Sequence, residues 1–167
     1  MTRKASFPPI TGPETRLLLL GSLPGEASLR AVRYYAHPQN QFWRLVGSMI
    51  GRDDLHGLAY EERLAVLAGA GIGLWDVVAD AVRPGSLDGA IRDHRPNDLR
   101  RLIAALPALR AIGFNGGTAA RIGRKLIGES SGIALLDLPS SSPAYTLSYA
   151  EKRSLWSKLD EFLDPGG

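Results

Sequence analysis

Residues 17–43 read LLLLGSLPGEASLRAVRYYAHPQNQFW. The four leucines at the start, Leu17–Leu20, form a short apolar run of the kind found in fully buried strands. The run ends at Gly21–Gly25, a loop rich in turn-forming residues. In open α/β sheets, ligands bind at the carboxyl ends of the strands. Two adjacent tyrosines, a His-Pro step and an asparagine follow this loop, so we expect a binding site beside it.

The chain of 167 residues is long enough for one domain with a single core. We expect a flexible tail at residues 1–15, which contain three prolines, and a single domain over residues 16–167. The absence of cysteine excludes disulfides, thiolate nucleophiles and Cys-bound zinc or iron–sulfur clusters. The three histidines lie far apart and show no metal-ligand spacing, so we expect neither a metal nor an organic cofactor.

The formal net charge is +3, from 20 Lys and Arg against 17 Asp and Glu. This mild excess is compatible with a phosphate-rich partner but does not require one. The amino terminus lacks the apolar region of a signal peptide, and no apolar run reaches membrane-spanning length. We therefore expect a cytoplasmic protein that does not bind membranes.

Apolar runs and helical spacings alternate along the rest of the chain. Strands are predicted at residues 16–21, 72–78, 111–114 and 133–138. Helices are predicted at residues 29–34, 40–50, 61–70, 98–106, 118–127 and 149–163, with Ser28 and Ser148 as N-caps of the first and the last. Residues 79–96 are expected to form a long connection. The alternation predicts an α/β fold, a three-layer αβα sandwich around a central, mostly parallel four-stranded sheet.

Three of the four predicted strands end in conspicuous loops, at Gly21–Gly25, Asn115–Gly117 and Pro139–Pro143. In a parallel sheet, right-handed crossovers place such loops at one edge. The loops offer amides, hydroxyls, backbone N–H groups and neighbouring aromatic rings, which suit a flat polar ligand and phosphates. They match neither the G-x-S-x-G elbow, nor the P-loop, nor G-x-G-x-x-G, so a serine hydrolase, a P-loop nucleotidase and a dinucleotide enzyme are disfavoured.

Three motifs, in order and spacing, resemble the uracil-DNA glycosylase superfamily. GSLPG at Gly21–Gly25, followed by YAHPQNQFW at Tyr35–Trp43, looks like its first motif, and the leucine in the third loop position is most similar to the hypoxanthine (deoxyinosine) DNA glycosylase branch. LPSSSPA at Leu138–Ala144 resembles the second motif of that branch. IGFNG at Ile112–Gly116 resembles its middle strand and base-contacting turn. The resemblance covers nearly the whole chain.

The resemblance implies a DNA glycosylase of base excision repair, which flips a deaminated base out of the DNA and hydrolyses its N-glycosidic bond. It implies Asn40 as the catalytic residue, because Ser22 and Leu23 occupy the positions that position water in other branches. Tyr35 is expected to stack on the base and Asn115 to contact its edge. The other implied base contacts are Ser22, Leu23, Pro24 and Gly25, and the implied DNA contacts are Ser28, His37, Ser140, Ser141, Ser142 and Pro143.

Several of these residues have a second interpretation. Asn40 is also a suitable cap for the helix predicted at 40–50, a role that is compatible with catalysis. Tyr35 is alternatively a core residue, Asn115 a turn former and His37 a structural residue.

The function also has alternatives. We expect a monofunctional, monomeric enzyme without lyase activity, because no catalytic lysine suggests itself, and we rank hypoxanthine before uracil. Glu26 and Asp76 are secondary candidates for an acid at the site. A non-catalytic nucleotide- or DNA-binding module, suggested by the apolar Leu23, and a nucleosidase acting on free nucleosides remain open. The sequence does not decide between hypoxanthine, uracil, xanthine and mismatched thymine, nor between single and double strands.

Overall fold

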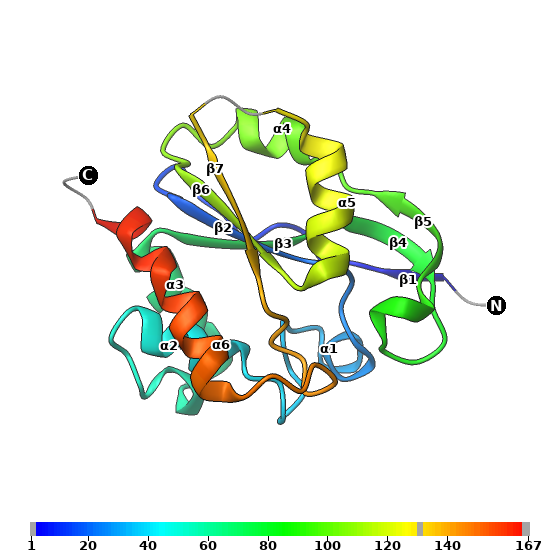
Figure 1. The fold of residues 1–167 in the computed structure, drawn as a ribbon, viewed down its shortest axis with the longest axis horizontal. Coiled ribbons are helices and arrows are strands. Elements are labelled where there is room, and N and C mark those ends of the chain that lie inside the picture. Colours follow the sequence, from blue (N-terminus) through cyan, green and yellow to red (C-terminus); the bar gives the residue numbers. More distant parts are fainter. Residues whose placement is uncertain (1–2, 130–131, 165–167) are drawn as a thin grey trace.

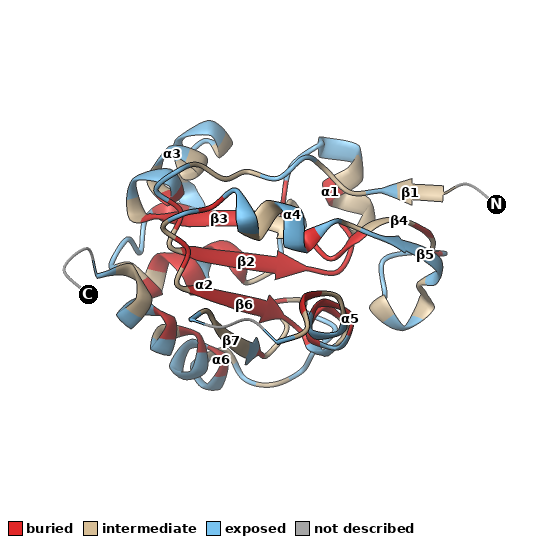
Figure 2. Ribbon diagram, turned by 90° about the horizontal axis from the view of Figure 1, so that it is seen from above, coloured by how far each residue is buried: buried red, intermediate tan, exposed pale blue. Residues whose placement is uncertain are grey.

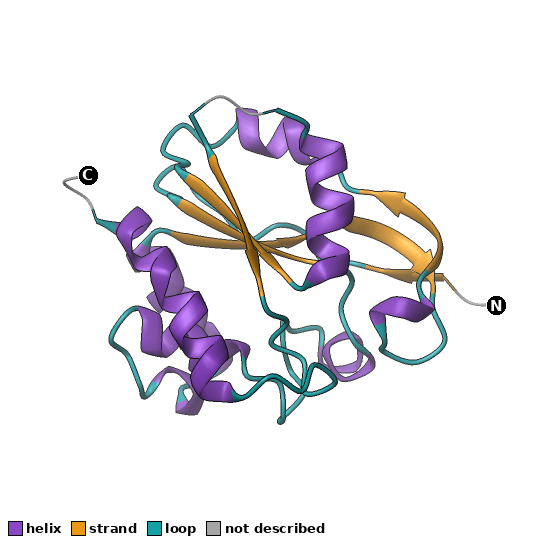
Figure 3. Ribbon diagram, in the orientation of Figure 1, coloured by secondary structure: helices purple, strands orange, loops and turns teal. Residues whose placement is uncertain are grey.

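The computed structural model describes residues 3–129 and 132–164. Its central sheet has four parallel strands in the order β3-β2-β6-β7 (Figures 1 and 3). The strands are β2 (Leu17–Gly21), β3 (Ile72–Asp76), β6 (Ala111–Asn115) and β7 (Ala134–Leu138). The predicted parallel sheet of four strands is therefore confirmed, and the carboxyl ends of all four strands lie at the same edge.

The leucines of β2 explain why the sheet is covered on both faces. Leu17 and Leu19 belong to one buried cluster, and Leu18 and Leu20 belong to the other, since side chains alternate along a strand. The first cluster packs under α2 (Phe42–Met49), α3 (Tyr60–Ala70) and α6 (Tyr149–Trp156). The second packs under α4 (Leu99–Ala104) and α5 (Gly117–Ile127). Figure 2 shows this buried strand layer between helices, which confirms the predicted αβα sandwich.

A second, antiparallel sheet occupies regions that were predicted to lack strands. It has the order β1-β4-β5, with β1 at Arg3–Ala5, β4 at Val78–Val82 and β5 at Arg92–Pro96. β1 lies in the segment predicted as a flexible tail, and β4 and β5 lie in and beside the predicted long connection. Every residue of β5 is exposed, so its sequence, RDHRP, has none of the apolar alternation from which strands are recognised.

Several predicted boundaries are wrong by a few residues. The strand predicted at residues 72–78 ends at Asp76, because Val77 is the step between the two sheets. Ser28 does not cap a helix: α1 spans Glu26–Ala31, with the extended residue Gly25 as its N-cap. The helix predicted at 149–163 ends at Trp156 and continues as the 3₁₀ segment η3 (Ser157–Leu163).

Two shorter 3₁₀ segments complete the fold, η1 at Leu55–Gly57 and η2 at Asp88–Ala90. Within the described residues, no helix combines the length and the apolar character needed to span a membrane.

Candidate active site

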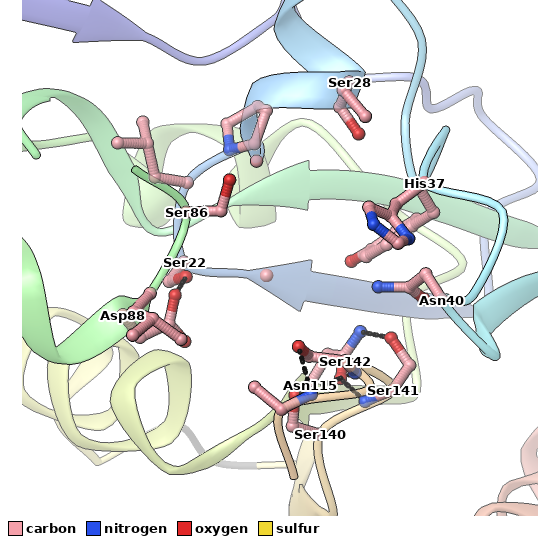
Figure 4. A pocket seen from close by; sticks show the side chains of 18 of the residues that line it. Ser22, Ser28, His37, Asn40, Ser86, Asp88, Asn115, Ser140, Ser141 and Ser142 are labelled. Atoms are coloured by element: carbon pink, nitrogen blue, oxygen red, sulfur yellow. Dashed lines mark hydrogen bonds between the residues drawn. The ribbon is translucent and has the colours of Figure 1, made fainter. Parts of the chain in front are cut away.

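One pocket of about 470 Å³ opens at the edge where the parallel strands end, and its size lies within the usual range of small-molecule sites (Figure 4). Its walls come from the loops after β2, β6 and β7, from the segment between α1 and α2, and from the loop between β4 and β5. The structure brings together every residue predicted for the site: Ser22, Leu23, Pro24, Gly25, Ser28, Tyr35, His37, Asn40, Asn115, Ser140, Ser141, Ser142 and Pro143.

The Gly21–Gly25 loop is held from behind by a buried arginine. Arg83 is 1 % exposed, and its guanidinium donates hydrogen bonds to the carbonyls of Leu23 (3.2 Å), Pro24 (2.6 Å) and Gly85 (2.7 Å). Because the planar guanidinium donates charge-assisted hydrogen bonds in fixed directions, these contacts fix the path of the loop. The loop between β4 and β5 thus supports the wall of the pocket.

Tyr35 holds its ring in the pocket by stacking on the core. Its ring lies nearly parallel to that of Phe42, with centroids 3.8 Å apart and an interplanar angle of 14°. Its carbonyl accepts a hydrogen bond from the Trp43 indole (3.2 Å). Its neighbour Tyr34, 3 % exposed, donates its hydroxyl hydrogen bond to the Pro8 carbonyl. Tyr35 therefore both contacts the core and lines the pocket, whereas Tyr34 is anchored mainly in the core.

Asn40 is oriented by the start of α2. Its Oδ1 accepts a hydrogen bond from the Phe42 N–H (2.9 Å), which satisfies one of the free donors at the helix start. The amide nitrogen Nδ2 points into the pocket, opposite Ser22 and Asp88 (Figure 4). The predicted N-cap role is wrong by one residue, because Gln41 is the N-cap of α2 and makes no side-chain cap bond. Asn40 instead bonds the first helical N–H from the preceding position, and the N–H donors of its side chain remain available to a ligand.

The Asn115 side chain is already bonded to the neighbouring loop. Its Nδ2 donates to Ser141 Oγ and its Oδ1 accepts from the Ser141 N–H, both at 2.9 Å. The Ser141 carbonyl accepts from the Gln41 N–H (3.0 Å). These bonds join three pocket loops, so Asn115 contributes to the pocket first of all by positioning Ser141.

The other predicted polar residues also make local hydrogen bonds. Ser28 Oγ accepts from the Ala36 N–H, and His37 Nδ1 accepts from the Gln39 N–H. Ser140 and Ser142 use their hydroxyl oxygens to accept from backbone N–H groups two residues onward. These serine hydroxyls act only as acceptors in the bonds named, so their own hydrogens remain available as donors to a ligand.

Three carboxyl groups line the same pocket. Asp76, at the end of β3, is 3 % exposed, and burial together with the charge of Asp88 raises the pKa of Asp76 to about 7. Asp88 accepts a hydrogen bond from the Ser22 hydroxyl (2.5 Å), and burial raises its pKa as well. The third, Glu26, is paired with Lys4, which lowers the pKa of Glu26.

Comparison with known proteins agrees with this arrangement. Residues 8–163 match the family model described as the uracil DNA glycosylase superfamily. The chain belongs to the uracil DNA glycosylase superfamily. Two relatives named hypoxanthine DNA glycosylase, from Methanosarcina barkeri and Methanosarcina acetivorans, are 39 % and 42 % identical over 156 residues, which cover 93 % of this chain and 97 % of each relative.

A solved structure shares the fold of this superfamily member. It is a solution NMR structure of a candidate uracil DNA glycosylase from Methanosarcina acetivorans, with a TM-score of 0.85 and 40 % sequence identity. The match covers 97 % of this chain and 99 % of the solved chain. The resemblance on which the motif assignment depended is therefore confirmed at the level of the family and of the fold.

Sequence reasoning missed the contribution of residues 83–88 to this glycosylase pocket. Arg83 supports the wall, while Ser86, Leu87 and Asp88 line the opening. Arg83-Pro84-Gly85-Ser86 is a recognisable turn sequence beside a cation. Nothing in its spacing, however, connects it to a loop that lies about sixty residues earlier in the chain.

Proposed function

We propose that this member of the superfamily is a monofunctional, monomeric DNA glycosylase of the cytoplasm. It hydrolyses the N-glycosidic bond of deaminated bases in DNA, hypoxanthine before uracil. The observation that carries the proposal is the position of Tyr35 and Asn40 on one pocket that is large enough to admit a nucleobase. The two relatives named hypoxanthine DNA glycosylase, matched over nearly their whole length, support the choice of base.

Tyr35 would bind the extruded base. One face of its ring is occupied by Phe42, so the ring is held rigidly and loses little entropy when a base stacks on its free side. Stacking of a base on an aromatic ring contributes about 1–3 kcal/mol. This gain is comparable with the cost of extruding a damaged base, which is roughly a few kcal/mol.

Asn40 would position the attacking water. An amide takes no proton at neutral pH, but its N–H groups can hold the water oxygen, and its dipole can act on the positively charged sugar of an oxocarbenium-like transition state. Positioning and preorganised dipoles are sufficient sources of rate enhancement for such a reaction. The cap to Phe42 fixes the Asn40 amide in advance, which removes the need for reorganisation during the reaction.

The loop after β7 would hold the DNA backbone. Ser140, Ser141 and Ser142 are neutral donors suited to phosphate oxygens, and Pro143 follows them at the pocket wall. Tyr145 is 49 % exposed at the end of the same loop, beside the Lys152 ammonium, which lies 5.4 Å from its ring centroid. These residues are positioned to contact the strand on either side of the extruded base.

The test uses labelled oligonucleotide duplexes that each carry one deoxyinosine, deoxyuridine, deoxyxanthosine or mismatched thymine. The strand is treated with alkali after incubation, since loss of a base leaves an alkali-labile site. We expect cleavage at deoxyinosine most rapidly and at deoxyuridine next, and intact strands when alkali is omitted. Strand breaks without alkali would contradict the monofunctional assignment.

The same assay separates the two alternative functions. A binding module would retard the deoxyinosine duplex in a gel without producing alkali-labile sites. A nucleosidase would release hypoxanthine from free deoxyinosine, and undamaged duplex DNA would not inhibit it. Either result would overturn the glycosylase proposal. In both cases Asn40→Ala should also behave as the wild type, because no base excision would depend on Asn40.

A further inference from the structure

The pocket contains a buried carboxyl group with an oxygen atom that no described residue hydrogen-bonds. Asp76 lines the pocket and is 3 % exposed, and its Oδ2 makes no hydrogen bond to any described residue. The Tyr35 hydroxyl, also buried in this pocket, makes no hydrogen bond of full geometry in the described part of the chain, although the Asn115 side chain lies near enough to offset part of the rise in its pKa. Buried polar groups without partners reduce stability, so such a pair is characteristic of a site that receives a ligand.

Gly21 provides the space that these two groups occupy. It lies beside Asp76 in the register of β2 and β3. A Cβ atom at position 21 would lie 2.7 Å from Asp76 Oδ1 and 3.0 Å from the Tyr35 hydroxyl oxygen. Both groups therefore converge on one point at the strand end, and only a glycine at position 21 leaves room for them.

The charged and titratable groups around Asp76 favour its neutral form. Burial raises the pKa of Asp76 most, and the nearby Asp88 raises it further; Arg83 acts in the opposite direction. The Arg83 N–H groups, however, donate to the backbone carbonyls of Leu23, Pro24 and Gly85. The phenols that face Asp76, Tyr34 and Tyr35, both have pKa values raised by burial, so they stay neutral and do not stabilise a carboxylate by charge.

We propose that Asp76 is a catalytic acid that donates its proton to the departing purine. The inference rests on the proposed glycosylase function and deepens it. The Asp76 O–H proton moves to an acceptor of hypoxanthine, N7 or O6, while the electron pair of the C1′–N9 bond goes to N9. Water then adds to C1′ and loses one proton to solvent, and Asp76 regains a proton from solvent. The base leaves neutral instead of as an anion.

This role explains why a buried carboxyl group lines the pocket. A neutral carboxyl both donates a hydrogen bond to the bound base and lowers the energy of its departure. General acids of this kind contribute on the order of 10²–10⁴-fold to the rate. A pyrimidine such as uracil lacks the imidazole ring and its N7, so it gains less from the same proton donor when N7 is the acceptor.

The test compares Asp76→Asn with wild type in single-turnover excision, with enzyme in saturating excess over the DNA, from pH 5 to 9. Asparagine keeps the shape and the hydrogen bond but has no proton to transfer. For deoxyinosine we expect the wild-type rate to fall about tenfold per pH unit above neutrality. Asp76→Asn should be slower by about 10²-fold or more at pH 6, with a flat profile. Asp137→Asn, at an exposed acid of β7, is the matched control and should behave as wild type.

Two further substrates make the result specific. If N7 is the acceptor, the rate of deoxyuridine excision should fall much less in Asp76→Asn than the rate of deoxyinosine excision. With 7-deazadeoxyinosine, equal rates for both proteins identify N7 as the acceptor, and a retained difference identifies O6. A pH-independent loss of equal size on deoxyinosine and deoxyuridine, or an Asp76→Asn rate equal to wild type, overturns the proposal. Failure of the wild type to release hypoxanthine would instead contradict the proposed function.

Discussion

Asn115 and Ser141 form a reciprocal pair of hydrogen bonds across the pocket floor, with Nδ2 donating to Oγ and the Ser141 N–H donating to Oδ1, each at 2.9 Å. Both residues are buried; Asn115 is the last residue of β6, and Ser141 follows the adjacent strand β7. The pair therefore fixes the serine loop relative to the sheet. A carboxamide used in this way has one N–H and one lone pair left for a base, so its first contribution is to the shape of the site.

Asn115→Ala should consequently lower stability as well as activity. Loss of the partner leaves the Ser141 N–H buried without an acceptor, at a cost of about 1–3 kcal/mol. For a chain of this size we expect the melting temperature to fall by several degrees. The melting temperature of Ser141→Ala should fall less, because this variant keeps the hydrogen bond from the backbone N–H of residue 141 to Asn115 Oδ1. An unchanged melting temperature with lost excision would instead assign Asn115 a direct contact with the base.

Asn40→Ser separates the two roles of Asn40. Serine can still accept from the Phe42 N–H, so the start of α2 should keep its stability to within about 0.5 kcal/mol, whereas Asn40→Ala loses about 1 kcal/mol. Both variants lack the amide that points into the pocket. We expect both to bind a deoxyinosine duplex normally in a gel-shift assay and to release hypoxanthine at least 10²-fold more slowly. Substantial excision by Asn40→Ser would show that the cap alone accounts for the residue.

Tyr35→Phe and Tyr35→Ala distinguish the ring from the hydroxyl. The phenylalanine variant keeps the stack on Phe42, so most of the base capture should remain. The alanine variant should lose about 1–3 kcal/mol of binding to the extruded base, or roughly 10–100-fold in excision at limiting enzyme. Fluorescence of a 2-aminopurine placed beside the deoxyinosine reports extrusion directly. Equal excision by Tyr35→Ala and wild type would exclude stacking.

Gly21→Ala should damage the site more than the fold. The added methyl group would lie 2.7 Å from Asp76 Oδ1 and must displace that side chain or the Tyr35 hydroxyl. We expect hypoxanthine excision to fall by 10²-fold or more, since positioning errors near 1 Å have effects of about this size. Gly57→Ala is the matched control, because a Cβ there meets nothing within 4 Å. Normal excision by Gly21→Ala would show that the crowded end of β2 is not used.

Asp76→Asn should stabilise the protein at alkaline pH. The pKa of Asp76 is about 7 in the folded protein, against roughly 4 for an unfolded Asp. The folded state holds a proton that the unfolded chain releases, so stability falls as the pH rises from about 4 to 7. Asp76→Asn should therefore raise the free energy of unfolding by on the order of 2–4 kcal/mol at pH 8 and by less than about 1 kcal/mol at pH 4. Parallel urea titrations of both proteins at the two pH values measure this difference, and equal shifts would contradict it.

The sequence alone was enough to predict the main sheet, its helix layers and the residues that line the pocket. Four consecutive leucines favour a strand that is buried on both faces, and the glycine and proline after them end that strand at the ligand-binding edge. Local rules also predicted that Asn40 bonds the start of a helix, with the N-cap placed one residue too early, because a short polar side chain before an apolar helical spacing is a local signal. The motif resemblance then placed every predicted site residue on one pocket.

Only the tertiary structure decided what supports that pocket. Every residue of β5 is exposed and most are charged, so no periodic apolar pattern predicted the second sheet or the loop that precedes β5. The contact of Arg83 with Leu23 spans sixty positions and the Asn115–Ser141 pair spans twenty-six, and backbone carbonyls, which every residue carries, accept the Arg83 bonds. The burial of Asp76 was equally undetermined, because the desolvation that makes a carboxyl group hold its proton depends on neighbours that only folding brings together.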